Sequence, residues 1–237
     1  MDAPEQPYAR PLSDRPVEAP RALVPPRRPL EGHVVRLEPL DPDRHGEELF
    51  TAGHGSAEAE AIWDYLPYGP WPDAAAQIAF LRTQAMAFDP IFFAIRPEDG
   101  PAQGVASYLE VEPAAGRIEI GHIWFGPALQ RTRAATEALA LMMLHAMDDL
   151  GYRRLQWKCN ALNARSRSAA RRLGFRFEGI LYNHLVVKGR NRDTAYYSIL
   201  DREWPEVRQA LQRWLAPDNF DATGRERIPL STLMAAR

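Results

Sequence analysis

The first group of residues whose types and spacing favour a chemical role lies at residues 125–138, where a strand-like run meets a helical run. Arg131 and Arg133 place two positive charges there, with no acid before Glu137. Free backbone N–H groups and the helix dipole favour an anion at such a junction, so a phosphate group would bind well. The alternative is that Thr132 only caps the helix and both arginines are solvated. There is no G-x-G-x-x-G or Walker pattern, which argues against ordinary dinucleotide and nucleoside-triphosphate sites.

A second basic window runs from residue 163 to residue 176 and contains no acid. Its five arginines are Arg165, Arg167, Arg171, Arg172 and Arg176. Arginine supplies almost all the basic residues of this chain, so a solvated arginine face is one reading. RNA binding is another, but the window lacks the interleaved aromatic residues that stack on bases, and nucleic-acid binding is therefore disfavoured.

The elements that must position these residues follow from hydrophobic periodicity. Strand-like runs are predicted at 33–38, where the strand would be an edge, and at 91–95, 104–111, 117–125, 154–159, 177–187 and 194–200. Helices are predicted at 41–53, 73–88, 132–150, 163–173 and 203–215, with a loop rich in aromatics and prolines at 63–72. This order predicts an α/β (α+β) fold with one sheet of mixed direction.

The ends of the chain differ from its middle. Eight of the 21 prolines lie in residues 1–30, which we expect to be a disordered or strapped extension. The segment 31–216 is predicted to be the folded domain. Residues 217–237 show no sustained period after Pro217 and are expected to form a C-terminal tail.

Composition excludes several classes of protein. The 237 residues include 29 basic and 31 acidic ones, so a net charge of −2 provides no global field for nucleic acid or an acidic membrane. No uncharged run approaches the roughly 20 residues of a membrane span, and no signal peptide is apparent. The single cysteine, Cys159, excludes an internal disulfide and a cysteine-based zinc site. We therefore expect a cytoplasmic protein without a metal.

Several short motifs occur in a characteristic order. They are Gly-Pro-x-x-Gln at 126–130, Ala-Thr-Glu-Ala at 135–138, Asn-Ala-Arg-Ser at 163–166, Leu-Gly-Phe at 173–175, Glu-Gly at 178–179, Arg-Asp-Thr at 192–194 and Glu-Trp-Pro at 203–205. Together with the order of elements, they resemble the GNAT superfamily of acyl-CoA-dependent N-acetyltransferases, specifically its RimJ/RimL-like branch. The resemblance covers residues 31–204 and implies a single, mostly antiparallel mixed sheet flanked by helices on both faces.

The resemblance implies a site for acetyl-CoA. Family members read Gln/Arg-x-x-Gly-x-Gly/Ala at the strand-to-helix loop, whose amides hold the coenzyme diphosphate; the matching residues are Gln130, Arg131, Thr132, Arg133, Ala134 and Ala135. Arg133 replaces the first glycine, and its Cβ disfavours a positive φ, so we expect a different loop path. Its guanidinium could compensate by gripping a phosphate. The pantetheine arm is expected to pair with a bulged strand at 118–124 through the main chains of Ile123 and Trp124, and to bond Asn163.

Two residues are candidates for proton transfer. Ser166 resembles the group proposed to protonate the leaving thiolate. Glu119 is the favoured base, directly or through a water, because an acid inside an apolar strand would have its pKa raised. His122 is the rival base. A regular strand would place Glu119 and His122 on opposite faces unless a bulge intervenes. Cys159 resembles a residue near the coenzyme sulfur, although a buried apolar role is the commoner one.

The aromatic loop resembles the acceptor-side loop of this branch. Trp63, Tyr65 and Tyr68 would form a wall of the acceptor site with His122, and Asp64 could bind a substrate ammonium. The alternative is a proline-rich lid packed on the core. An α-amine suits a site with little basic assistance, because about a third of it is neutral near pH ~7.5 against about 0.1% of a lysine amine.

These expectations define an acetyl-CoA-dependent N-acetyltransferase. A primary amine, either a protein N-terminal α-amine or a small amino compound, would attack the thioester directly. The alternative is an acyl-CoA-binding regulatory module with little or no turnover, suggested by the missing loop glycine. The resemblance also implies a homodimer as one arrangement, with no surface identified.

Overall fold

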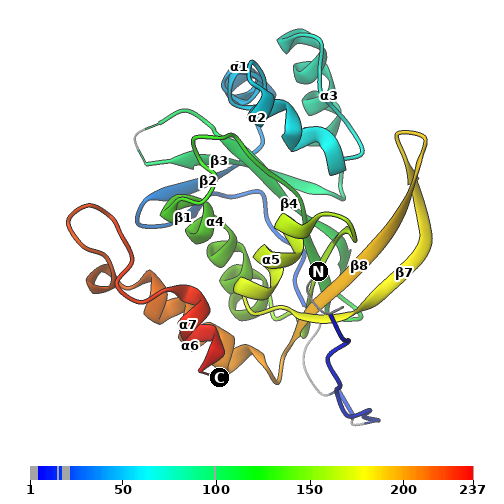
Figure 1. The fold of residues 1–237 in the computed structure, drawn as a ribbon, viewed down its shortest axis with the longest axis vertical. Coiled ribbons are helices and arrows are strands. Elements are labelled where there is room, and N and C mark those ends of the chain that lie inside the picture. Colours follow the sequence, from blue (N-terminus) through cyan, green and yellow to red (C-terminus); the bar gives the residue numbers. More distant parts are fainter. Residues whose placement is uncertain (1–4, 15, 18–21, 99, 237) are drawn as a thin grey trace.

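The computed structural model describes residues 5–14, 16–17, 22–98 and 100–236 and contains one sheet with strand order β1-β2-β3-β4-β5-β6-β8-β7 (Figure 1). The strands are β1 Leu30–Glu31, β2 Val35–Pro39, β3 Ile91–Pro97, β4 Gly104–Glu112, β5 Arg117–Phe125, β6 Arg154–Asn160, β7 Arg176–Val187 and β8 Arg190–Leu200. Neighbours are antiparallel except β5 and β6, which run parallel. The predicted fold class is confirmed.

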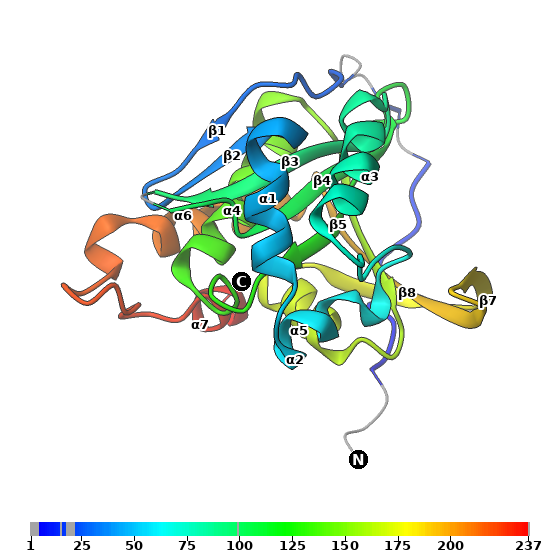
Figure 2. The same ribbon diagram turned by 90° about the horizontal axis from the view of Figure 1, so that it is seen from above.

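Helices cover both faces of this sheet. They are α1 Pro42–Gly53, α2 Ala57–Glu60, α3 Ala74–Met86, α4 Arg133–Leu144, α5 Ala164–Arg172, α6 Trp204–Leu215 and α7 Leu230–Ala235. The first three lie on one side of the sheet, and α4 to α7 lie on the other (Figures 1 and 2). Short 3-10 turns occupy Ala61–Tyr65 and Pro217–Asn219, and a π turn, His145–Asp149, continues α4.

Side-chain caps fix where the helices begin. Asp41 accepts hydrogen bonds from two N–H groups at the start of α1, and Asp73 accepts one, from the N–H of Ala76, at the start of α3. Thr132 accepts from the N–H of Ala135 at α4, and Asn163 from the N–H of Ser166 at α5. Such bonds satisfy N–H groups that have no partner within a helix. The helix starts indicated by the sequence are therefore found at the predicted residues or one residue later.

Two apolar clusters form the core. The larger lies under α4 and α6 and includes Ile118, Ile120 and Met142, while the smaller lies under α1 and α3 and contains Trp63 and Trp124. β5 thus alternates its side chains between the two. This arrangement fixes which face of β5 each functional side chain can use.

The folded unit includes residues on both sides of the expected 31–216 domain. Phe220, Leu230 and Met234 belong to the larger cluster, so the segment expected to be a tail packs on α6. Before residue 31, Arg10 bonds Glu178, Ser198 and Glu203, and the N–H of Tyr8 bonds the main chain of β7. This part of the proline-rich extension is strapped to β7 and β8. Residues 1–4, 15 and 18–21 lie outside the described residues.

Two smaller differences from the sequence reading concern elements. The strand at 35–39 is not an edge, because β1 pairs with it on its outer side. The helix expected at 132–150 ends as a regular α-helix at Leu144 and then widens into the π turn. In the described part of the chain, no helix has the length and apolar character needed to cross a bilayer.

Candidate active site

The region of interest is the gap in strand pairing between β5 and β6, called the β5–β6 cleft below. Their parallel pairing is confined to residues 117–119 of β5 and 154–156 of β6. From Ile120 onward, the edge of β5 that faces β6 has no strand partner among the described residues. An extended chain could therefore add to this edge through main-chain hydrogen bonds.

The main chains of Ile123 and Trp124, the two residues predicted to bind the pantetheine arm, point in different directions. The N–H of Gly126 bonds the carbonyl of Gln103, next to β4, and a Cβ on Gly104 would meet the Trp124 carbonyl oxygen at 2.3 Å. Trp124 therefore turns its main chain toward β4, and alternation turns that of Ile123 toward the opening. Of the pair expected to hold the pantetheine arm, only Ile123 turns its main chain toward the opening.

A bulge in β5 controls what faces the cleft. The register with β4 shifts between Ser107↔Gly121 and Val105↔Trp124, and His122 adopts a φ of +50°. The extra residue breaks the strict alternation. As a result Glu119, Gly121 and His122 share one face, the face of α1 and α3. A Cβ added to Gly121 would lie 3.2 Å from Oε1 of Glu119.

Glu119 belongs to a buried charge cluster. Its Oε2 lies 2.9 Å from Nζ of Lys158, and the same ammonium pairs with Glu110. Burial raises the pKa of Glu119 to about 7, although Lys158 opposes the shift. Burial tends to lower the pKa of Lys158, but Glu119 and Glu110 outweigh it and hold that pKa above its ordinary value. A carboxyl group that titrates near neutrality beside a permanent cation is suited to accept a proton.

His122 has a different environment. Its ring stacks on Tyr68, with centroids 5.6 Å apart and planes inclined by 15°, and lies 5.2 Å from the ring of Phe92. Burial, assisted by the charge of Arg192, lowers the pKa of His122 to about 4. The imidazole is therefore neutral at physiological pH and is a much weaker base than Glu119.

Ser166 and Cys159 lie on the opposite face of β6. Oγ of Ser166 accepts a hydrogen bond from Nε1 of Trp157 at 3.0 Å. An indole N–H only donates, so the serine hydroxyl hydrogen remains available to another acceptor. Burial raises the pKa of the Cys159 thiol, and a hydrogen bond from Ser166 opposes that shift. Ser166 can thus donate to a sulfur in this region.

The loop before α4 has the features of an anion site. Among the hydrogen bonds of the described residues, none uses the backbone N–H of Arg131, Arg133 or Ala134. Thr132 is occupied as the cap, and the Gln130 side chain donates to the carbonyl of Phe125 at 2.9 Å. Gln130 therefore shapes the loop, and three main-chain donors are left at the positive end of a helix.

Arg133 follows a path that needs no glycine. It has helical backbone geometry as the first residue of α4, and the left-handed φ of this loop, +62°, belongs to Arg131. The Arg133 guanidinium lies 3.7 Å from the ring centroid of Phe220, and its Nε lies 3.9 Å from Oε2 of Glu137. The expected change of loop path thus involves a neighbouring residue, and the C-terminal segment holds the arginine.

The aromatic loop has one buried and two more exposed members. Trp63 is 1% exposed, donates from Nε1 to the carbonyl of Gly53 and packs on Trp124, so it supports the loop from behind. Tyr65 donates to the carbonyl of Leu162, and Lys188 bonds the Trp63 carbonyl. These bonds connect the loop to the β6–α5 segment and to the β7–β8 turn across the cleft.

Of the three predicted aromatic residues, Tyr68 is the one that contacts His122. Its hydroxyl is buried without a hydrogen-bond partner in the described structure, and burial raises its pKa far above the ordinary value. Asp64 lies near Lys188, which is the cation it influences. The structure therefore brings Tyr68 to His122 and leaves Trp63 in the core.

Sequence reasoning missed Lys158, Glu110 and Arg192. Lys158 is one of only two lysines in the chain, which was a usable signal. Its neighbours depend on the pairing of β4, β5, β6 and β8, which no local pattern specifies.

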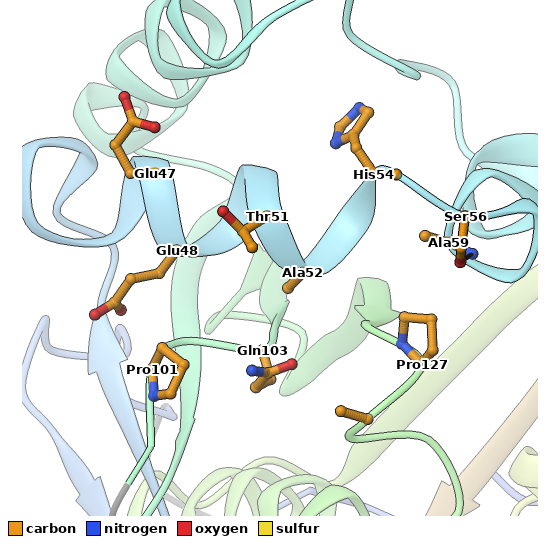
Figure 3. Close-up of a pocket in the computed structure, with 12 residues that line it drawn as sticks. Glu47, Glu48, Thr51, Ala52, His54, Ser56, Ala59, Pro101, Gln103 and Pro127 are labelled. Atoms are coloured by element: carbon orange, nitrogen blue, oxygen red, sulfur yellow. Dashed lines mark hydrogen bonds between the residues drawn. The ribbon is translucent and has the colours of Figure 1, made fainter.

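A surface cavity of about 530 Å³ lies elsewhere, between α1, the start of α2 and the segment after β5 (Figure 3). Its lining includes Glu47, Glu48, Thr51, His54, Gln103 and Pro127. Glu48 is already paired with Arg96 there. This cavity holds none of the residues predicted to act in catalysis, and the chemistry points to the β5–β6 cleft.

The sheet, its bulged fifth strand and the helix-start loop define an acyltransferase of the GNAT type. A comparison with protein families agrees: the family described as "Acetyltransferase (GNAT) domain" matches residues 35–176. The chain belongs to the GNAT acetyltransferase family, as the motifs indicated.

Known proteins show similarity at different levels. A GCN5-related N-acetyltransferase from Brucella melitensis is 44% identical, with a TM-score of 0.88 over 92% of this chain and 99% of that one. A structure from Chromobacterium violaceum ATCC 12472 described as "probable acetyltransferases (GNAT family)" is 42% identical, with a TM-score of 0.76 over 84% and 100% of the two chains. "Putative ribosomal N-acetyltransferase YdaF" of Bacillus subtilis (strain 168) is 30% identical over 106 residues, 45% of this chain. That match spans 57% of the YdaF length. The resemblance to the GNAT family is thereby confirmed, and the name of the Bacillus subtilis relative supports the RimJ/RimL-like branch.

Proposed function

We propose that this protein is an acetyl-CoA-dependent N-acetyltransferase in which a primary amine attacks the thioester directly. The observation that carries the proposal is the position of Glu119, a carboxyl group whose pKa burial raises to about 7, on the bulged strand that borders the open β5–β6 cleft. A base of this strength is suited to removing a proton from an amine at neutral pH.

The residues around the cleft fit the coenzyme. The three unpartnered N–H groups at Arg131, Arg133 and Ala134 suit a diphosphate, and the free edge of β5 at Ile123 suits an extended amide-containing arm. Asn163 uses its Oδ1 to cap α5, which leaves its amide nitrogen to donate to that arm. Acetyl-CoA would supply the acetyl group as a thioester.

The proton steps follow from the two faces of the cleft. Glu119 takes a proton from the acceptor amine, directly or through a water, while Lys158 keeps its second partner, Glu110. The main-chain N–H at Ile123 is directed to the cleft and donates toward the carbonyl oxygen, where negative charge develops. Ser166, whose hydroxyl interacts with the Cys159 thiol, turns its hydrogen from that thiol to the coenzyme sulfur and donates to it.

The acceptor carries an α-amine in this proposal, on a protein N-terminus or a small amino compound. An α-amine is substantially neutral near pH 7.5, so one base of pKa about 7 suffices. The name of the Bacillus subtilis relative, a ribosomal N-acetyltransferase, supports an acceptor of this type.

Thiol release measures the activity directly. The purified protein is incubated with acetyl-CoA and a panel of α-amines, and free coenzyme A thiol is followed against a control without amine. Release above hydrolysis, with the N-acetylated product identified by mass, is the expected result. A protein that binds coenzyme A but releases no thiol with any amine would be a binding module instead.

A further inference from the structure

Arg192, on β8, is a cation without a partner in the described structure. No hydrogen bond, ion pair or ring contact involves its side chain, and its Nε is sealed from solvent. The residue is only half-buried, so the terminal nitrogens of the guanidinium remain open to a ligand. A sealed donor without an acceptor is unfavourable, and it favours an anion supplied from outside the chain.

Strand register places Arg192 on the face of the sheet that carries Lys158 and Glu119. Lys158 of β6 pairs in register with Tyr196 of β8, and the Lys158 ammonium lies 5.1 Å from the Tyr196 ring centroid while holding Glu119. Residues two and four apart on a strand share a face. Arg192 therefore projects from the same face as Tyr196, at the open end of the cleft.

The charge of Arg192 acts on three groups around the reaction centre. It favours the ionised form of Glu119 and of the Cys159 thiol, and it disfavours protonation of His122. These groups come from β5 and β6, so the charge of Arg192 acts on both strands that border the cleft.

Among the residues that the structure describes, no acid forms an ion pair with this cation. Glu119 is held by Lys158 at 2.9 Å and forms no ion pair with Arg192. Asp193, the adjacent residue, accepts from the N–H of Asn183 at 2.7 Å and from the side chain of Asn191 at 3.0 Å. Asp89 influences His122 but is bonded to the N–H of Val111. The available acids are thus committed elsewhere.

We propose that Arg192 binds a carboxylate of the amine acceptor, so that the acceptor is an amino acid or a peptide whose acidic group lies beside its α-amine. The proposal rests on the proposed function and names the class of substrate for that site. A guanidinium forks onto a carboxylate through two parallel hydrogen bonds. The buried, unpartnered hydroxyl of Tyr68, whose ring stacks on His122, is a second donor on this face.

Matched acceptors test the proposal at saturating acetyl-CoA. One arm compares free amino acids with their amides, and the other compares short peptides carrying Asp or Asn, or Glu or Gln, at the first two positions. A preference in the first arm identifies a free amino acid as the acceptor, and a preference in the second identifies a peptide with an acidic N-terminus. We expect kcat/KM to favour the carboxylate member of at least one arm by about ten- to a hundredfold.

Variants assign that preference to the guanidinium. Arg192→Gln is expected to reduce the ratio to near one, mainly through KM for the carboxylate acceptor, and Arg192→Lys to recover part of it. Arg190→Gln is the matched control, because Arg190 is exposed two residues earlier on the same strand. Thermal melting of each variant verifies that it is folded.

The outcomes separate the two proposals. Equal kcat/KM for both members of every pair in the wild type overturns the carboxylate assignment and leaves N-acetylation intact. A loss of kcat in Arg192→Gln that is equal for all acceptors, with the acceptor preference unchanged, also overturns the carboxylate assignment. The charge of Arg192 would then act on the reacting atoms instead. Absence of thiol release with all acceptors overturns the N-acetyltransferase proposal and this inference together.

Discussion

Glu119 and His122 are three residues apart on β5 and yet project from the same face of the sheet. The extra residue at the bulge, where His122 takes a φ of +50°, brings them together and allows Arg192 to act on both. Their pKa values move in opposite directions from the same cause: burial disfavours the charge of the carboxylate and the charge of the imidazolium alike. The first therefore becomes a stronger base and the second a weaker one.

This contrast predicts the pH dependence of the reaction. Glu119 must be ionised to act as a base, so kcat/KM should rise through a pKa of about 7, in addition to the rise caused by the acceptor amine near ~8. Glu119→Gln should lower kcat by about a hundredfold or more and remove the lower inflection. The measurement is thiol release between pH 5.5 and 9 with one α-amine; a variant that keeps the inflection near 7 would remove Glu119 from the role of base.

Ser166→Ala tests the proton for the departing sulfur. The hydroxyl is expected to contribute to kcat but not to coenzyme affinity, so kcat should fall about ten- to a hundredfold while the Kd for coenzyme A, measured by calorimetry, stays the same. Ser168→Ala is the matched control, since Ser168 is exposed on the same helix. An unchanged kcat would mean that solvent supplies the proton.

Arg133→Gln tests the charge that replaces a glycine. If the guanidinium held against Phe220 also meets a phosphate, this variant should weaken coenzyme A binding about tenfold, and the loss should shrink as salt concentration rises. Phe220→Leu should cause a smaller loss through the freedom it gives Arg133. Calorimetry at two salt concentrations measures both effects, with exposed Arg202→Gln as control; equal affinity in Arg133→Gln and wild type contradicts the contact.

Arg131 provides a test of stability. It holds a φ of +62° in an exposed position, a conformation that glycine adopts without cost. Arg131→Gly should therefore raise the free energy of unfolding by a few tenths to about 1 kcal/mol, and Arg131→Val should lower it by about 1 kcal/mol or more. Denaturant titration of the three proteins gives the order, and a destabilised glycine variant would show that the side chain itself holds the loop.

Cys159 should react slowly. The residue is 6% exposed, and burial raises the pKa of its thiol, so little thiolate is available at neutral pH. Labelling with a maleimide at pH 7 should proceed at least tenfold more slowly in the native protein than in the unfolded chain. Rapid native labelling would place the cysteine on an accessible wall of the cleft.

Local signals in the sequence determined the order and the boundaries of most elements. Asp41, Asp73 and Thr132 begin helices because their side chains accept hydrogen bonds from N–H groups two or three residues away, which is a property of the chain nearby. The position of Glu119 within the apolar strand 117–125 likewise predicts a raised pKa from local sequence alone. Family membership followed from short motifs of the same local kind.

The tertiary structure decided what surrounds those residues. The ammonium of Lys158 beside Glu119 and the packing of Phe220 under Arg133 join positions far apart in sequence. The bulge that unites Glu119 with His122 and the unpartnered guanidinium of Arg192 depend on how the strands pair. Strand register and side-chain packing are set by the free energy of the whole core, and a single residue shift would reverse the face of every side chain on a strand. Sequence periodicity is enough to predict the helices and strands, whereas the charge environment of the site forms only when these elements pack together.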